Sequence, residues 1–176
     1  QRLVDSLHQA DNDMRASVGQ VNTLTASIAK LNQQIGDAPT NADVAPLKDR
    51  LDMALQDLSK LTDISVIMHP NGTADVAVAS GHPLVVGKTS YDLSVTNAPV
   101  TGRAEVRTSD GTDITATLDS GSLGGQRAVR DVLVPDYQQQ LDQLAYDFAD
   151  AVNTVSQSGY DLNGNTGPML YLPLAT

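Results

Sequence analysis

The sequence predicts an α+β fold, an elongated bundle of about three long helices with an inserted small, mainly antiparallel β domain. Near both ends of the chain apolar residues repeat every seven positions, which is typical of long helices that face a partner helix. Between these segments the repeat shortens to two, which is typical of half-buried strands. We therefore expect a helical hairpin over 1–62 and a β-rich insert over 63–121. Over 122–176 we expect a kinked helix that completes the helical domain and ends in a truncated turn segment.

The first helix is expected over 3–35, because nine of the ten positions in its two heptad stripes are apolar. Gly36 is expected to end the helix as its C′ residue, with Pro39 just beyond it. The side chains of the stripes should form a packing seam, whose members in this helix are Leu7, Met14, Val21, Leu24, Ile28, Leu31 and Ile35.

The second helix is expected to begin near Asp43, a suitable capping residue, because Pro46 is acceptable only in a first helical turn. Leu51 and Leu58 continue the packing seam on its apolar stripe, which ends at Leu61. The short connection between the two helices favours an antiparallel hairpin.

The β-rich insert is expected to form one sheet of five or six strands. The first two strands, 64–68 and 74–78, flank Asn71-Gly72, which supplies the positive φ angles that a hairpin turn requires. Further strands are expected over the segments 84–86, 91–95, 104–107 and 114–118, which Gly, Pro, Asn and Asp residues separate.

The last helical segment is expected to start at Ser122, a capping residue, and to be divided by Pro135 into a short helix near 123–133 and a long helix from about 136. Gly159 should end the long helix. Its apolar residues should form a third stripe that packs against the first two helices, with Tyr137, Leu141, Leu144, Phe148, Ala151 and Val155 as its members.

Composition excludes several classes of protein. The net charge is −10 with only 11 Lys and Arg residues, so we expect no nucleic-acid partner. Cysteine is absent, and no apolar run is long enough for membrane insertion. The chain begins at Gln1 inside a helical pattern, without a signal peptide, so we expect an internal fragment of a longer protein.

No pattern in the sequence designates a catalytic residue or a cofactor. The motifs GxSxG, SxxK and HExxH are absent, so we expect no enzyme activity. Gly124 and Gly125 precede a helix as the glycines of phosphate-binding loops do, but the Lys of a P-loop is missing. We prefer glycines that allow a close approach of two backbones.

Asp161, Asn163 and Asn165 alternate like the first ligands of an EF-hand calcium loop. The second half of that loop does not match, because Thr166 replaces its Gly and Leu172 replaces its bidentate Glu. We therefore interpret the segment as an Asx-rich turn, and we keep a calcium-dependent binding module as an alternative.

Several segments, in this order and spacing, resemble the flagellar hook-associated protein 1 family, the bacterial hook–filament junction proteins. These segments include Leu31-Asn32-Gln33-Gln34-Ile35, Gly81-His82-Pro83-Leu84-Val85, Gly124-Gly125, Arg130-Asp131, Leu141-Asp142-Gln143-Leu144-Ala145 and Gly159-Tyr160-Asp161-Leu162-Asn163-Gly164.

The resemblance implies a structural subunit that acts by self-assembly and axial packing, exported outside the cell by the flagellar type III apparatus without a cleaved signal. It implies as partners other copies of the subunit, the flagellar hook protein and hook-associated protein 3. It also implies that the family's terminal segments are missing from this chain, so we expect the fragment to be monomeric. An adhesin or a phage-tail-like fibre segment remains a further alternative, since such proteins also contain elongated helices.

Overall fold

The computed structural model describes residues 2–38, 40–78 and 80–172, and it confirms an α+β fold. The chain divides into two compact units, an N-terminal unit (Gln1–Val132) and a C-terminal unit (Leu133–Thr176), which we describe separately. The helices are α1 (Arg2–Asp37), α2 (Asn41–Leu61), α3 (Gly121–Ala128) and α4 (Val134–Ser158), with a π-helical turn at Val129–Leu133 between the last two. None of the described helices is long and apolar enough to cross a membrane.

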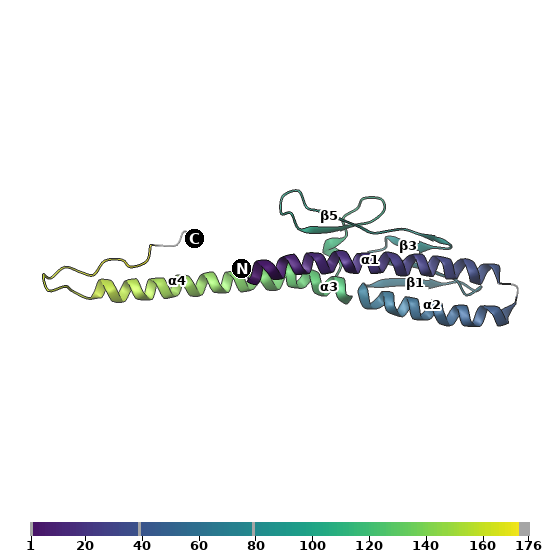
Figure 1. Cartoon of the computed structure of the whole chain (residues 1–176), viewed down its shortest axis with the longest axis horizontal. Helices are drawn as coiled ribbons and strands as arrows, with labels where there is room; N and C mark the ends of the chain where they lie inside the picture. Colours follow the sequence, from purple (N-terminus) through teal and green to yellow (C-terminus); the bar gives the residue numbers. More distant parts are fainter. Residues whose placement is uncertain (1, 39, 79, 173–176) are drawn as a thin grey trace. The chain divides into compact units, whose positions relative to one another are not determined.

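Helices α1 and α2 form the predicted antiparallel hairpin (Figure 1). The expected end of α1 and the expected start of α2 are wrong. Helix α1 continues through Gly36 to Asp37, so Gly36 is not its C′ residue, and Pro39 lies outside the described residues. Helix α2 begins before Asp43, because the Thr40 hydroxyl accepts a hydrogen bond from the Asp43 amide and caps the helix earlier.

The core of the N-terminal unit is built around α1. Met14, Val21 and Ile28 are completely buried, and they belong to one apolar cluster with Leu51 and Leu58 of α2. Strand and loop residues complete the cluster, among them Leu84, Val85, Leu93, Val106, Ile114 and Leu118. Of the seam residues of α1, Leu31 and Ile35 are also buried, whereas Leu7 and Leu24 are half-buried.

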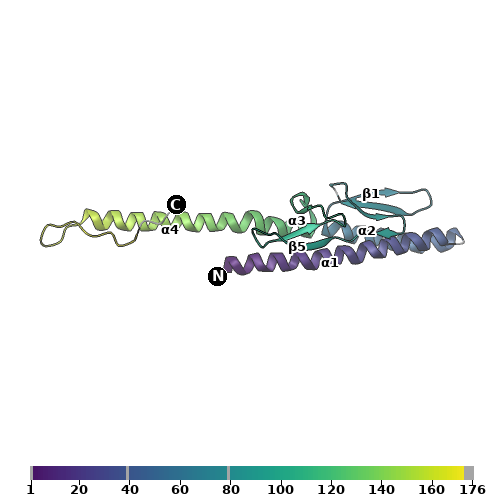
Figure 2. The ribbon, with the colours of Figure 1, turned by 90° about the horizontal axis from the view of Figure 1, so that it is seen from above.

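The β part contains two sheets rather than the single sheet expected. Strands β1 (Ile64–Met68), β2 (Ala74–Val78), β3 (Pro83–Val86) and β4 (Thr89–Ser90) form an antiparallel sheet in chain order, and β5 (Ser94–Asn97) pairs with β6 (Ala104–Arg107). The predicted hairpin is confirmed, with Ile64 opposite Val78. Figure 2 shows the two sheets at different positions along α1.

The strand expected over 114–118 is wrong, because this segment forms a 3₁₀ turn at Thr115–Thr117. The Asp113 carboxylate accepts hydrogen bonds from the amide and the hydroxyl of Thr115, and the Thr115 hydroxyl accepts one from the Val106 amide. These side-chain hydrogen bonds take the place of a strand ladder. The strand expected over 91–95 likewise begins later, at Ser94.

The helical segment after the β part begins earlier than expected. Ser120, not Ser122, is the N-cap residue of α3. The backbone between α3 and α4 widens into the π-helical turn at Val129–Leu133, immediately before Pro135. Proline has no N–H to donate to the carbonyl four residues earlier, and its ring crowds that carbonyl, so a locally widened helix relieves both problems.

In the C-terminal unit, α4 ends at Ser158, which agrees with the prediction that Gly159 ends this helix. The chain then turns through a bridge between Tyr160 and Thr166 and returns alongside α4 (Figure 1). The Ser156 hydroxyl donates a hydrogen bond to the Pro168 carbonyl during this return.

Candidate functional site

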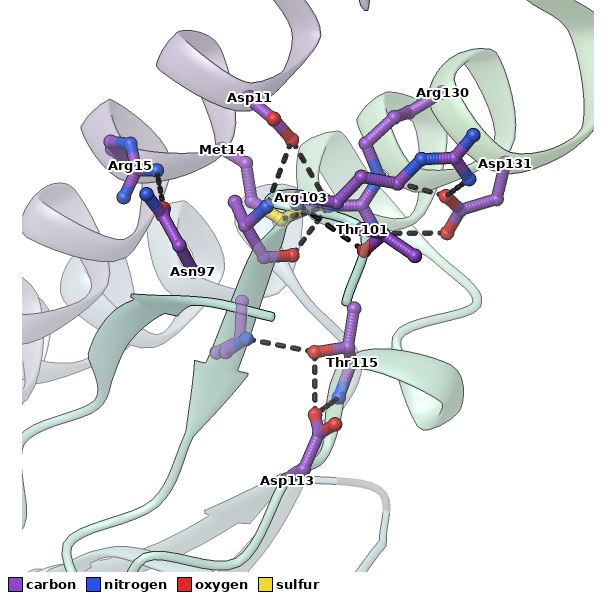
Figure 3. Close-up of polar contacts among 12 residues, drawn as sticks. Asp11, Met14, Arg15, Asn97, Thr101, Arg103, Asp113, Thr115, Arg130 and Asp131 are labelled. Carbon is purple, nitrogen blue, oxygen red and sulfur yellow. Dashed lines mark hydrogen bonds and ion pairs between the residues drawn. The ribbon is translucent and has the colours of Figure 1, made fainter. Parts of the chain in front are cut away.

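The most tightly connected polar group of the N-terminal unit surrounds Arg130, whose side chain is almost completely buried (Figure 3). Arg130 donates two parallel hydrogen bonds to Asp131, Nε to Oδ1 and Nη2 to Oδ2, both at 2.8 Å. Its Nη1 donates to Asp11 Oδ1 at 3.1 Å and to the Ala104 carbonyl at 2.5 Å. Arg103 Nη1 reaches Asp131 Oδ1 at 3.2 Å. We call these five residues the Arg130 joint.

The Arg130 joint connects three segments that are far apart in the sequence, namely α1 through Asp11, the start of β6 through Ala104, and the π-helical turn through Arg130 and Asp131. Its two guanidinium groups and two carboxylates balance in charge. A buried arginine requires such partners, because an unpaired charge in a protein interior costs several kcal/mol. The joint therefore holds the β part, α1 and the turn before α4 in one arrangement.

The joint also moves the pKa values of its members. Hydrogen bonding to Asp131 raises the pKa of Arg130, against the opposing effect of burial. Burial acts to raise the pKa of Asp131, but the hydrogen bonds and positive charges of Arg130, with the charge of Arg103, outweigh it and lower that pKa below 3.8. Both groups are consequently held in their charged forms at neutral pH.

Two asparagines of α1 hold other parts of the β region in a similar way. Asn32 Oδ1 accepts a hydrogen bond from the Ala74 amide at 2.9 Å, and its Nδ2 donates to the carbonyls of Ala74 and Gly87 at 2.7 and 2.6 Å. Asn22 pairs in the same fashion with the amide and carbonyl of Leu93, at 2.9 and 2.8 Å. Each side-chain amide thus accepts from a backbone N–H and donates to a backbone carbonyl, as the backbone of a neighbouring strand would. We call Asn22 and Asn32 the asparagine clamps.

The clamps and the joint are regularly spaced along α1. Asp11, Asn22 and Asn32 follow one another at intervals of eleven and ten residues, or about three helical turns each. Sequence reasoning missed all three, because short polar side chains flank the apolar stripes of α1 at other positions too, such as Asn12 and Asp13, and no pattern distinguishes these three. The buried Ser17 is also paired, since its hydroxyl accepts a hydrogen bond from Gln126 Nε2 at 2.9 Å.

The apolar stripe of α4 has a different environment. Tyr137, Leu141, Leu144, Phe148 and Val155, which we call the α4 stripe, are all more than half exposed, Leu144 at 64% and Val155 at 72%. This differs from the expectation that these side chains are covered. Within the described residues only Phe148 has an aromatic partner, Tyr171, with ring centroids 6.0 Å apart. All four charged residues of α4 are aspartates, Asp136, Asp142, Asp147 and Asp150.

Asn153 acts as a third clamp, inside the C-terminal unit. Its Oδ1 accepts hydrogen bonds from the amides of Leu170 and Tyr171 at 2.8 and 2.9 Å, and its Nδ2 donates to the Tyr171 carbonyl at 2.8 Å. Asn153 is buried although most of α4 is exposed. The returning chain is therefore fastened to α4 by hydrogen bonds between its backbone and the Asn153 side chain.

The glycines before Arg130 differ from one another. A Cβ on Gly124 would lie 2.5 Å from the carbonyl carbon of Asp119, so the backbones approach too closely for any other residue. A Cβ on Gly125 would meet no atom within 4 Å. Gly124 thus allows the close approach of two backbones that we expected of both glycines. No such contact explains Gly125.

Asp161, Asn163 and Asn165, the weak candidates for metal ligands in the sequence, form the Asx-rich turn. Asp161 Oδ1 accepts hydrogen bonds from the amides of Asn163 and Asn165, both at 2.8 Å, and Asp161 Oδ2 accepts one from Asn165 Nδ2 at 3.0 Å. The hydrogen bonds from Asn165 lower the pKa of Asp161. The carboxylate thus orders the turn, and no cluster of three or more acidic or imidazole ligands occurs in the described part of the chain.

The sequence profile of the family described as "Flagellar hook-associated protein FlgK helical domain" matches residues 1–171. The chain belongs to this FlgK helical-domain family. It is 33% identical to flagellar hook-associated protein 1 of Escherichia coli K12 over 181 residues, which cover 95% of the chain and 32% of that protein. Flagellar hook-associated protein 1 of Salmonella typhimurium LT2 is 33% identical over 178 residues, with the same coverage of both chains.

The fold agrees with this family assignment. The flagellar hook junction protein FlgK from Burkholderia pseudomallei superposes with a TM-score of 0.71 and 30% identity, and the match covers 96% of this chain and 33% of that one. The resemblance to the flagellar hook-associated protein 1 family, which we inferred from the sequence segments, is therefore confirmed. The chain spans about a third of the length of the relatives that it matches.

Proposed function

We propose that this FlgK helical domain is part of a structural subunit at the hook–filament junction of the bacterial flagellum, and that it works by packing rather than by catalysis. The observation that supports this most strongly is the family match over residues 1–171, together with relatives whose names place them at the hook or its junction. As partners we propose other copies of the subunit, the hook protein and hook-associated protein 3. The proposed location is outside the cell, reached without a cleaved signal peptide.

The geometry of the domain suits such a role. The N-terminal unit has a continuous apolar core and a buried, charge-balanced joint, which resist deformation. The α4 stripe offers a row of exposed apolar side chains along a single helix. Exposed apolar rows of this kind are typical of surfaces that another protein segment covers. We therefore propose that the α4 stripe is a packing surface in the assembled flagellum.

The test uses the full-length protein that contains this domain, produced in cells that lack their own copy. Leu144→Asp places a charge in the α4 stripe, and Gln139→Asp adds the same charge to another exposed position of α4. We expect Leu144→Asp to abolish or strongly reduce filament formation and swimming, and Gln139→Asp to leave both intact.

Two further measurements make the result decisive. Secreted protein is quantified in the culture medium, which separates a failure of assembly from a failure of export. Circular dichroism of each purified variant shows whether the helices form. Normal swimming with folded, secreted Leu144→Asp protein would contradict the proposed packing role of the stripe.

A further inference from the structure

The chain contains two Asn-Gly pairs, Asn71-Gly72 in the β1–β2 hairpin and Asn163-Gly164 in the Asx-rich turn. Asparagine followed by glycine is the sequence most prone to spontaneous deamidation, because glycine has no Cβ to hinder attack by its own amide nitrogen. The sequence alone gives the two pairs nearly equal reactivity. Their surroundings in the structure are very different.

The reaction needs only water and hydroxide. The glycine N–H loses its proton, and the nitrogen attacks Cγ of the preceding asparagine side chain, so that a C–N bond forms and a five-membered succinimide closes. The bond from Cγ to the side-chain nitrogen breaks, and that nitrogen takes up a proton and leaves as ammonia. Water then opens the ring at one of its two carbonyls, giving aspartate or isoaspartate.

Asn71 is held in a form that resists this attack. Its Oδ1 accepts hydrogen bonds from the Thr73 amide at 3.1 Å and the Thr73 hydroxyl at 2.8 Å. The Gly72 amide donates to the His69 carbonyl at 2.8 Å, and Gly72 is buried under the Lys48 side chain, whose Cε occupies the space that a Cβ on Gly72 would need. The nucleophile is shielded from hydroxide, and the carboxamide cannot rotate freely.

Asn163 lacks two of these protections, the hydrogen bonds that hold the carboxamide and the side chain that covers the glycine. Both asparagines are exposed, but the Asn163 side chain takes part in no hydrogen bond with the residues that the structure describes. Gly164 is also exposed, and a Cβ on it would meet no atom within 4 Å. The Gly164 amide, like that of Gly72, donates to a backbone carbonyl, that of Asp161 at 3.0 Å, but it does so within a solvent-facing turn.

We propose that Asn163 is a site of spontaneous covalent modification, the position at which this chain deamidates first, and that the fold protects Asn71. The product carries one more negative charge, two residues from the Asp161 carboxylate. The isoaspartate form also adds a methylene to the backbone of the turn. That lengthening separates Asp161 from the Asn165 amide, whose hydrogen bond orders the turn.

The experiment incubates the folded chain in mildly alkaline buffer and follows each Asn-Gly peptide by protease digestion and mass spectrometry. The same incubation in concentrated urea supplies the intrinsic reactivity of both pairs. We expect Asn163 to deamidate several times faster than Asn71 in the folded chain, and the two rates to converge in urea. Equal rates in the folded chain, or faster reaction at Asn71, would overturn the proposal.

A pair of variants tests the cause of the protection. Lys48→Ala uncovers Gly72, and Thr73→Val removes the hydroxyl that holds Asn71. We expect each to accelerate deamidation at Asn71 and to leave the rate at Asn163 unchanged, with circular dichroism confirming that the chain remains folded. If Asn71 reacts at its original rate in both folded variants, the local shielding described above is wrong.

Discussion

Helices α1 and α4 carry apolar stripes with the same seven-residue repeat, but the two stripes have opposite environments. In α1, Met14, Val21 and Ile28 are completely buried, whereas in α4 Leu144 and Val155 are mostly exposed. The difference is accompanied by polar anchoring. Helix α1 carries the Arg130 joint and two asparagine clamps that fasten it to the β part, whereas α4 carries one clamp that holds only its own returning chain. A repeat therefore shows that a helical face needs a cover, and the anchoring polar residues show whether the chain itself supplies it.

The largest effect is expected at the Arg130 joint. Arg130→Met leaves Asp11 and Asp131 without their main partner in a buried setting, so the free energy of unfolding should fall by about 3–5 kcal/mol. Lys60→Met removes the exposed ion pair with Asp57, and its cost should stay below about 1 kcal/mol. Urea unfolding of both variants measures the difference. Similar costs for the two would contradict the joint's structural role.

The next effect contrasts the covered stripe with the exposed one. Met14→Ala opens a cavity in the core of the N-terminal unit and should cost about 2–5 kcal/mol. Leu144→Ala removes a side chain from an exposed position and should cost no more than about 0.5 kcal/mol. The same urea unfolding experiment applies. A large loss of stability in Leu144→Ala would show that the isolated chain already covers its α4 stripe.

Loss of a clamp should also cost more stability in α1 than in α4. Asn32→Ala leaves the Ala74 amide unpaired in the buried region and should cost about 1–3 kcal/mol. Asn153→Ala releases Leu170 and Tyr171, which are exposed and can bond water instead, so the unfolding of the N-terminal unit should not change. Comparable losses of stability in the two variants would be evidence against the contrast.

A smaller effect concerns pH. Because the pKa of Asp131 is lower in the folded chain than its ordinary value of 3.8, its ionised form stabilises the fold. This contribution is complete well above pH 3.8 and is lost as the pH falls through the lower folded pKa. Asp131→Asn should therefore show a shallower loss of stability on acidification than the unmodified chain, in urea unfolding at a series of acidic pH values. Parallel acid profiles would show that Asp131 contributes nothing to acid sensitivity.

The smallest expected effect is the absence of self-association. We propose that the isolated chain is monomeric at micromolar concentration, because its net charge is −10 and every charge on α4 is negative, so the aspartates of two α4 helices repel each other and oppose the pairing of their apolar stripes. Size exclusion with light scattering should give the mass of one chain. A stable dimer or ring would contradict this proposal.

Much of the fold could be predicted from the sequence because local signals determine it. The heptads predicted the three long helices, and Asn71-Gly72 predicted the β1–β2 hairpin. The β-branched residues of segment 114–118 predict a strand, but hydrogen bonds from Thr115 to the Asp113 carboxylate stabilise a 3₁₀ turn instead. Alternation along a strand cannot reveal that a neighbouring carboxylate competes for the backbone amides.

The candidate site was less predictable. Arg130 and Asp131 could be singled out only through the family resemblance, and nothing in the sequence indicated that Asp11 lies beside them. Asn32 lies in one of the segments that carry the family resemblance, but the resemblance assigned it no role. Such contacts join residues that are far apart in the chain, and single-sequence patterns carry no information about them. Periodicity correctly predicted a long helix with one apolar stripe at α4, but the prediction that this stripe packs against the first two helices is wrong, because its side chains are exposed.

Amide hydrogen exchange tests the central claim most directly, when it is measured on α1 and α4 in the isolated chain and in assembled flagella. A single helix without a packed face is marginally stable, so α4 amides should exchange quickly in the isolated chain while α1 amides around Met14 and Ile28 stay protected. In assembled flagella, the α4 amides should become strongly protected. Equal protection of α4 before and after assembly would contradict the account.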